Sequence, residues 1–392
     1  MEVIQSQPRM DPRPTETHQT VRHAVREFAE REIAPHVMQW DEAQRFPSEL
    51  RPGLAALGLL GIQVPAKYGG AEMSAVEYCI CIEELARVDP SVALSVAAHN
   101  GLSAAHLLMF GSDTQRLSFL APLAKGEMFG AWALTEPGAG SDAGATRTVA
   151  RRVTDGWILD GVKTFTTHGS VAGVVVTMAV TDRAAGHRGI SAFAVDQGTP
   201  GLVVGRKENK LGMRASDTAE LRFESCRVAT DRLVGREGQG FVNALQVLDA
   251  GRIGIAALSV GLAQGAFEAA RHYAMEREQF GQPIASFQAT QWKLADLATR
   301  IESARLLTYR AACLKDEGRA TTRESSMAKL YASEVAVRAA EECVQIHGGY
   351  GFVKDYPAEK FFRDVKLLTI GEGTSEIQRL VIARQYMGER AH

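Results

Sequence analysis

The sequence predicts an α+β protein with an N-terminal α-helical domain, a middle β-sheet domain of barrel-like form and a C-terminal four-helix bundle. Both ends repeat apolar residues three and four apart, whereas the middle has short runs rich in Val, Thr and Phe, bounded by Gly, Asp and Pro. The length of 392 residues exceeds what one hydrophobic core usually supports. We expect a flexible arm at 1–16, the helical domain at 17–128, the sheet domain at 129–239 and the bundle at 240–392.

The N-terminal part begins with the polar stretch MEVIQSQPRMDPRPTE, which contains three prolines. This composition favours a loose arm over an import sequence. Helical spacing follows at 21–40, 75–87 and 113–123, and the segments RFPSE and VPAKYGG interrupt it. These residues therefore predict a domain of helices joined by turns.

The pattern changes twice along the rest of the chain. After residue 129 the runs GWILDGVKTFTT, VAGVVVTMAV, ISAFAVD and LVVGRKEN have the composition of strands, which predicts a compact sheet. From residue 240 onward, Ala, Leu, Glu and Arg dominate, and a further helix follows near the C-terminus. The four long helical segments of this part are 241–273, 288–315, 321–346 and 357–367, which predict a bundle.

Charge and hydropathy argue against two classes of partner. A formal net charge of -2 without a long basic run gives no footprint for nucleic acid or an anionic membrane. No apolar run approaches the length that spans a bilayer, and the N-terminus does not read as a signal sequence. We therefore expect a cytoplasmic protein that does not insert into membranes.

The cysteines and histidines do not suggest a metal site. Cys79 and Cys81 lie two residues apart in a helical pattern, so their thiols point to different faces of the helix. The five cysteines are expected to be reduced core thiols. His99, His106 and His347 show no metal-ligand spacing, so structural or solvated roles are expected for them.

The candidate catalytic base is Glu372, in the segment IGEGTSEIQRLVIAR at 370–384. Ser375 and Gln378 fit a capping box that starts an amphipathic helix, which places Glu372 in the preceding turn. Gly371 and Gly373 permit backbone angles that let this turn present the carboxylate to a cavity. The alternative is a glutamate that only offsets the helix macrodipole.

The string GEGTSEIQRLVIAR resembles the catalytic segment of the acyl-CoA dehydrogenase family, and the resemblance runs from about residue 17 to the C-terminus. Segments such as GRIGIA, SARLLTYRAA and EGTSEIQRLVIA look most similar to the short-chain members. Six further blocks carry the resemblance in the family's order: ALTEPGAGSD, KTFTTHG, KLGMRASDTAELRFESCRV, LDAGRIGIAA, EREQFGQPIASFQATQWKLAD and QIHGGYGFVKDYPAEKFFRD.

The resemblance implies FAD-dependent α,β-dehydrogenation of an acyl-CoA thioester to the trans-2-enoyl-CoA. Glu372 would remove the α-proton, and hydride would pass to flavin N5, since no side chain accepts hydride. The backbone N–H of Glu372 and a flavin ribityl hydroxyl would hold the thioester oxygen, and electrons would then pass to an electron-transfer flavoprotein. Some relatives carry the base just before the arginine of GRIGIAA, but here that position is Gly251, which cannot act as a base.

The resemblance also implies flavin contacts from two regions of one chain and from neighbouring subunits. Pro137, Gly138 and Gly140 would keep the first loop close to the ligand, and a complete site would require an oligomer, by resemblance a homotetramer built as a dimer of dimers. The cofactor-binding residues expected near the ring and pyrophosphate are Thr135, Ser141, Phe165, Thr167 and Thr374, and those expected at the adenosine diphosphate end are Arg277, Phe280, Gln288, Gln345 and Gly349.

The expected substrate-binding residues are Ser191, Asp249, Arg252, Gly371 and Gly373, and the segment 214–218 resembles a surface that lines the CoA path. Arg252 would hold the charge balance of the active site, or it is an ordinary buried ion pair with Asp249 or another acid.

Two positions depart from the family pattern. His168 stands where Asn is more usual, and Gly371 stands where many members carry Tyr. We expect the second departure to leave room for acyl groups that are bulkier than a plain short chain.

Two other functions fit the same resemblance. An acyl-CoA oxidase would reduce oxygen, although typical oxidases carry a longer C-terminal extension. A non-catalytic or nucleic-acid-associated member would keep flavin and lose the reaction, which the intact Glu372 argues against. Acyl chain length depends on small differences in cavity volume, each worth about 1 to 3 kcal/mol per methylene, so the motifs alone do not fix it.

Overall fold

The computed structural model describes residues 15–388, so the arm expected at 1–16 lies outside the described residues except for its last two. Those two residues already form the start of a helix. The hydroxyl of Thr15 accepts a hydrogen bond from the backbone N–H of His18, and α1 (Glu16–Phe28) begins at the next residue. The helical part of the chain therefore starts slightly earlier than the sequence indicates.

The N-terminal part is helical, as predicted, but its helices are shorter than the apolar pattern suggests. The predicted segment 21–40 is divided among α1, a π-helical turn and α2, and the segment 113–123 is similarly divided. Ser74 forms a capping box with Glu77 at the start of α4. The helices here are α1 (Glu16–Phe28), α2 (Val37–Ala43), α3 (Arg51–Ala56), α4 (Ala75–Val88), α5 (Pro90–Ala98), η5 (His99–Ala104), α6 (Ala105–Phe110), α7 (Asp113–Gln115) and α8 (Ala121–Ala124).

The middle part forms one mixed sheet with the order β6-β7-β3-β2-β4-β5-β8, and β1 pairs in parallel with β4. The sheet ends at β6 and β8, which do not pair with each other, so it is open and "barrel-like" describes it only loosely. One face packs on the N-terminal helices through a core that includes Val174, Val176 and Ala192. The strands are β1 (Phe129–Ala133), β2 (Val149–Val153), β3 (Gly156–Thr167), β4 (Ala172–Val180), β5 (Ile190–Asp196), β6 (Leu202–Lys207), β7 (Thr218–Ala229) and β8 (Leu233–Val234).

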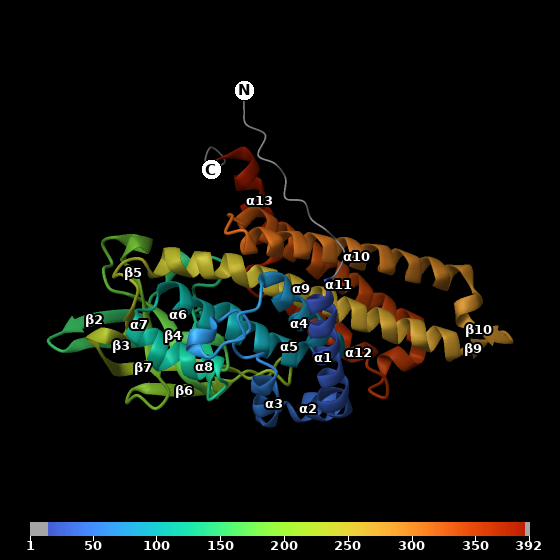
Figure 1. Ribbon diagram of the computed structural model, residues 1–392, viewed down its shortest axis with the longest axis horizontal. Coiled ribbons are helices and arrows are strands. Elements are labelled where there is room, and N and C mark those ends of the chain that lie inside the picture. Colours follow the sequence, from blue (N-terminus) through green and yellow to red (C-terminus); the bar gives the residue numbers. More distant parts are fainter. Residues whose placement is uncertain (1–14, 389–392) are drawn as a thin grey trace.

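The C-terminal part is helical, as predicted, and Figure 1 shows its long helices lying side by side above the N-terminal helices. The longest, α9, runs from the end of the molecule that holds the sheet to the hairpin of β9 (Glu278–Gln279) and β10 (Gln282–Pro283) at the other end (Figure 1). At 1.5 Å per residue its 37 residues span about 55 Å. The helices are α9 (Gly240–Glu276), α10 (Gln288–Asp316), α11 (Thr322–His347), α12 (Ala358–Asp364) and α13 (Ser375–Met387).

One face of α9 is lined with glycines that allow the N-terminal helices to approach closely. A methyl group at Gly261 would overlap the carbonyl oxygen of Glu83, and one at Gly265 would overlap that of Arg87. Gly254 is similarly covered by the hydroxyl of Tyr78. As a result the N-terminal helices and the bundle share one continuous hydrophobic core.

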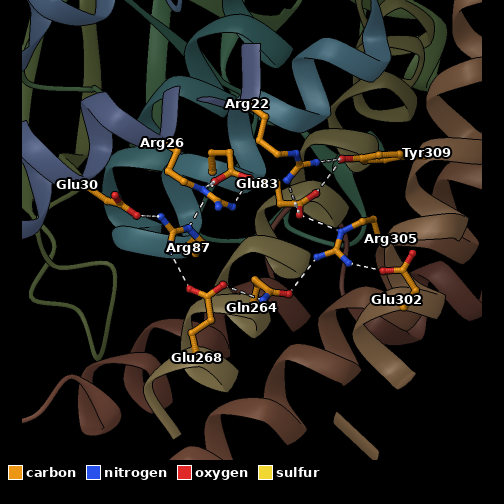
Figure 2. Close-up of polar contacts among 11 residues, drawn as sticks. Arg22, Arg26, Glu30, Glu83, Arg87, Gln264, Glu268, Glu302, Arg305 and Tyr309 are labelled. Carbon is orange, nitrogen blue, oxygen red and sulfur yellow. Dashed lines mark hydrogen bonds and ion pairs between the residues drawn. The ribbon is translucent and has the colours of Figure 1, made fainter. Parts of the chain in front are cut away.

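A polar network crosses this shared interface and joins α1, α4, α9 and α10 (Figure 2). Its centre is Glu83, which is 2% exposed and accepts hydrogen bonds from Arg305 at 2.9 Å and from the hydroxyl of Tyr309 at 3.0 Å. Arg22 binds both Glu83 and the adjacent buried Glu84. The remaining members drawn are Arg26, Glu30, Arg87, Gln264, Glu268 and Glu302.

Two helical stretches, Pro90–Phe110 and Gly240–Glu276, are long and apolar enough to cross a membrane, contrary to the sequence-based expectation that no such run exists. In each, 78% of the apolar window is buried inside the protein. Their apolar content is therefore accounted for by the core that they form.

Candidate active site

Glu372 lies in the turn between η12 (Val365–Thr369) and α13, and its own backbone adopts the left-handed conformation, with φ of 53°. Gly373 follows with φ of 96°. The sequence assigned the unusual angles to the two glycines, but Gly371 has no positive φ and Glu372 itself carries the strain. A left-handed non-glycine residue costs free energy and occurs often at functional sites.

The start of α13 also differs from the prediction by one residue. Thr374, not Ser375, is the N-cap, and its hydroxyl accepts a hydrogen bond from the N–H of Ile377 at 3.3 Å. Gln378 does not complete a capping box. Its side-chain amide instead donates to the carbonyl oxygen of Glu372 at 3.3 Å and to that of Gly373 at 2.9 Å. These two hydrogen bonds from α13 thereby stabilise the strained turn at residues 372–373.

The carboxylate of Glu372 points to the middle of α9, where it packs against Gly251 and near Leu102 of η5. Its Oε2 atom is buried and has no hydrogen-bond partner among the residues that the structure describes. Burial raises the pKa of Glu372 to about 7, against the opposing effects of Lys329 and Arg252. A carboxylate whose basicity is raised by burial is suited to accept a proton from a bound molecule.

Arg252 lies near this carboxylate, and one of the two roles considered for it, an ion pair with Asp249, is present in the structure. Its guanidinium donates to Asp249 at 2.6 Å, and the second oxygen of Asp249 accepts from the hydroxyl of Thr322 at 2.5 Å. The Arg252 Nε atom is buried without a partner. The ion pair with Asp249 thus joins α9 to α11 and leaves part of the guanidinium facing the site of Glu372.

A second group of predicted residues gathers on the sheet. The carbonyl oxygen of Thr135 accepts from the N–H of Thr164 at 2.9 Å, which joins the loop after β1 to the end of β3. On β3, Phe165 has φ of 54° and is 65% exposed, and Thr167 lies two residues further on. Ser141 is exposed in the same loop, where Gly138 and Gly140 have no atom within 4 Å of an added Cβ. The exposed ring of Phe165 fits the flat ring of FAD, and the open loop at residues 138–141 fits its pyrophosphate.

Glu136 and Lys163, which the sequence analysis did not single out, fix this loop. Lys163 is fully buried and donates to Glu136 at 2.7 Å and to the carbonyl oxygen of Leu134 at 3.0 Å. The same carboxylate accepts from the backbone N–H groups of Arg147 and Thr148. Both residues stand within the motifs ALTEPGAGSD and KTFTTHG, and for Lys163 the available signal was a charged residue within the predicted strand GWILDGVKTFTT.

His168, the departure from the usual Asn, is fully buried with φ of 62°. Its Nδ1 lies 3.1 Å from the carbonyl oxygen of Gly130, and the ring packs against Phe129 and Phe46. Burial lowers the pKa of His168, so the imidazole is neutral at pH 7. The residue therefore holds the turn after β3 to the start of β1.

The residues expected at the adenosine diphosphate end gather elsewhere, at the far end of α9. Phe280 is at the tip of the β9–β10 hairpin, with φ of 56° and 93% exposure. Arg277 lies over the ring of Tyr350 at 5.8 Å. Gln288, Gln345 and Gly349 are exposed in the same region, after the hairpin and around the end of α11.

Two predicted substrate contacts have structural explanations in this chain. Ser191 is fully buried, and its hydroxyl pairs with Thr181 at 2.8 Å and accepts from the N–H of Gly238 at 2.8 Å. In the segment 214–218, Asp217 accepts from Ser170 and so binds the turn that contains His168. These contacts position the sheet and its loops, and they give no support for direct contact with substrate.

Comparison with known proteins agrees with this arrangement. Models of the N-terminal, middle and C-terminal domains of acyl-CoA dehydrogenase match residues 15–127, 131–226 and 238–387 in turn. The mitochondrial short-chain specific acyl-CoA dehydrogenase of Rattus norvegicus is 46% identical over 368 residues, covering 94% of this chain and 89% of that protein.

Two solved structures are also similar. Butyryl-CoA dehydrogenase from Megasphaera elsdenii has a TM-score of 0.94 at 40% identity and covers 96% of this chain and 100% of its own. A chain from a structure described as the electron transferring flavoprotein of Acidaminococcus fermentans has a TM-score of 0.96 at 43% identity, covering 97% and 100%. The present chain therefore belongs to the acyl-CoA dehydrogenase family and is an FAD-dependent oxidoreductase that dehydrogenates an acyl-CoA.

Proposed function

We propose that this enzyme oxidises a short-chain acyl-CoA to the trans-2-enoyl-CoA, with Glu372 as the base that removes the α-proton. The single observation that carries the proposal is the buried Oε2 atom of Glu372, which has no hydrogen-bond partner within residues 15–388 and lies against Gly251. Similarity to butyryl-CoA and short-chain specific dehydrogenases supports the short chain length.

The chain's own residues account for the proton removal. The α-proton of a thioester is too weakly acidic for a carboxylate in water, so the site must raise the basicity of Glu372 and stabilise charge on the thioester oxygen. Burial does the first, since it raises the pKa of Glu372 to about 7. The backbone N–H of Glu372 donates to no acceptor within residues 15–388, and it is our candidate donor for the second. When bound, FAD supplies the hydride acceptor that no side chain provides.

Glu372→Gln tests the assignment. The variant should fold and retain FAD, and it should lose flavin reduction by butyryl-CoA by roughly 10² to 10⁴ in rate, the usual contribution of a positioned base. Anaerobic stopped-flow bleaching gives the rate, and the flavin spectrum gives the cofactor content. Bleaching at close to the wild-type rate would reject Glu372 as the base.

We propose that an electron-transfer flavoprotein reoxidises the enzyme, a choice supported by similarity to the chain from the Acidaminococcus structure. An oxidase would instead react quickly with oxygen. Reoxidation of the substrate-reduced enzyme in air, compared with reoxidation by an electron-transfer flavoprotein, separates the two. Absence of any bleaching in the wild type would favour a non-catalytic flavin protein.

We further propose a cytoplasmic homotetramer with FAD sites shared between subunits. The two groups of flavin residues support sharing, because the sheet and the β9–β10 hairpin lie toward opposite ends of the molecule (Figure 1). Arg277→Ala should therefore weaken both flavin retention and assembly, which sedimentation and flavin content measure together. A wild-type monomer that is replete with FAD would contradict the proposal.

A further inference from the structure

Lys329 on α11 is a fully buried lysine that contacts the turn of Glu372 directly. Its ammonium donates to the carbonyl oxygen of Gly373 at 2.6 Å, the same oxygen that accepts from Gln378. Within residues 15–388 no carboxylate lies within ion-pair distance of it. Burying an ammonium group costs folding free energy unless an opposite charge or hydrogen bonds stabilise it. We therefore expect Lys329 to have a specific charged partner.

The charges around Glu372 identify that partner. Arg252 from α9 and Lys329 from α11 both face the carboxylate, while Tyr78 approaches from α4. Asp249 already forms the ion pair of Arg252, and Glu376 on α13 acts on Lys329 from a greater distance than hydrogen bonding. Lys329 is thus the buried positive charge near Glu372 that has no ion-pair partner of its own.

We propose that Lys329 is a positioning residue for the reaction: its ammonium fixes the turn at residues 372–373 and serves as the buried counter-charge of Glu372. The first role follows from the 2.6 Å contact with Gly373, which lies next to a residue in a strained conformation. The second follows because an opposite charge nearby favours the ionised carboxylate, which burial alone would keep protonated. The inference rests on the proposed function, in which ionised Glu372 accepts the α-proton.

Burial lowers the pKa of Lys329 to about 8, with Glu372 acting in the opposite direction. The lysine is therefore charged over the pH range in which Glu372 ionises, near pH 7. Removing its charge should raise the pKa of Glu372 further. The acidic limb of the kcat/KM profile should then move to higher pH, because the free enzyme must lose a proton from Glu372 before it can act as a base.

Two substitutions separate the roles. Lys329→Gln keeps an amide donor for the carbonyl oxygen of Gly373 and removes the charge, whereas Lys329→Met removes both. Both should shift the acidic limb upward by roughly 1 unit or more, the effect of losing an opposite charge close to a carboxylate. Lys329→Met should in addition lower kcat, because the turn loses its hydrogen bond. Lys315→Gln is the control, since Lys315 is a partly buried lysine whose ammonium donates to the side-chain oxygen of Gln63 at 2.9 Å, and it should leave the limb in place.

The pKa of Glu372 is read independently of turnover from the infrared band of its protonated carboxyl group, assigned by its loss in Glu372→Gln. A lower kcat with an unmoved limb and an unmoved carboxyl titration in both variants would show that Lys329 is only structural, which would overturn the proposal. Thermal unfolding and flavin content establish that each variant is folded. If Glu372→Gln itself retained flavin reduction, the assignment of the base would fail, whereas a normal loss in that variant with no shift in the Lys329 variants would reject the present inference alone.

Discussion

The carboxylate of Glu372 rests directly on the backbone of Gly251, so closely that a methyl group at position 251 would overlap Oε2. Gly251 therefore has two roles. It leaves room for the carboxylate of the proposed base, and it replaces the base that some relatives carry at this position. Gly101 of η5 packs against Gly251. A Cβ added at Gly101 would lie 3.7 Å from the Cα of Gly251. The backbones of η5 and α9 therefore approach each other closely beside the proposed base.

Gly251→Ala should displace Glu372 and leave the fold intact, because alanine is favourable inside a helix. A shift of about 1 Å in a reacting group costs roughly 10²-fold in rate, and we expect a loss of that order in anaerobic flavin reduction. Gly265→Ala is the matched control, since it puts the same methyl on the same helix face against the backbone of Arg87. It should lower Tm and leave the reduction rate near wild type, and equal rate losses in both would contradict the prediction.

The pH dependence of stability should report the ionisation of Glu372. Its folded pKa of about 7 is above the ordinary value of 4.5, so its stabilising contribution is full below pH 4.5 and is lost as pH rises through 7. Glu372→Gln has no ionisable group at this position, so its stability does not fall with pH for this reason. The stability of the variant relative to wild type should therefore increase by about 3 kcal/mol between pH 4 and pH 8. Denaturant unfolding at both pH values measures the difference, and a constant difference would argue against the raised pKa.

Gly371→Tyr should restrict the acyl group that the enzyme accepts. The three atoms nearest to a Cβ at this position all belong to Leu367 and lie at 3.5 to 3.7 Å, which is ordinary contact distance, so the backbone leaves room for a side chain. We expect kcat/KM to fall roughly 10-fold or more for branched or ring-bearing thioesters and less for butyryl-CoA, as is usual when an apolar pocket loses volume. Gly371→Ala controls for the loss of glycine in the turn. Equal losses for both substrates, or no wild-type activity on any bulky thioester, would mean that other side chains fill the space.

Glu83→Ala should destabilise the contact between the N-terminal helices and the bundle. The substitution removes a carboxylate that is 2% exposed and that binds both Arg305 and Arg22, and removing one partner of a buried ion pair costs about 3 to 5 kcal/mol. The exposed pair of Arg45 and Glu49 provides the control, because Glu49→Ala should cost about 1 kcal/mol or less. Chemical denaturation gives both values, and similar losses would show that the network in Figure 2 adds little.

The order of helical, sheet and helical parts could be predicted from periodicity because each part buries its apolar residues on a continuous face. Residue patterns were less informative about the backbone conformation of the turn at residues 371–373. Gly371 and Gly373 were expected to absorb the unusual angles, yet Glu372 adopts one itself, since the tertiary contacts of Gln378 and Lys329 hold it there. Local sequence carries no signal for those contacts.

Side chains that act through buried charge were also missed. Lys329 stands among small residues on one face of α11. From the sequence alone, a lysine at such a position is predicted to be exposed to solvent, because the packing of neighbouring helices on that face is not known. Glu136 and Lys163 are 27 residues apart, and only the pairing of the loop after β1 with β3 brings them together. Motifs located the flavin residues because those motifs are contiguous, whereas the supporting pairs come from different elements.

The glycines along α9 have a consequence for how the chain folds. Each glycine inside a helix costs about 1 kcal/mol relative to alanine, so α9 is a weak helix in isolation and gains its stability from docking. The N-terminal surface that docks on Gly254, Gly261 and Gly265 is contributed by α4. The first and last thirds of the sequence should consequently form as one cooperative unit, and the C-terminal helices synthesised without the N-terminal ones should not reach their native packing.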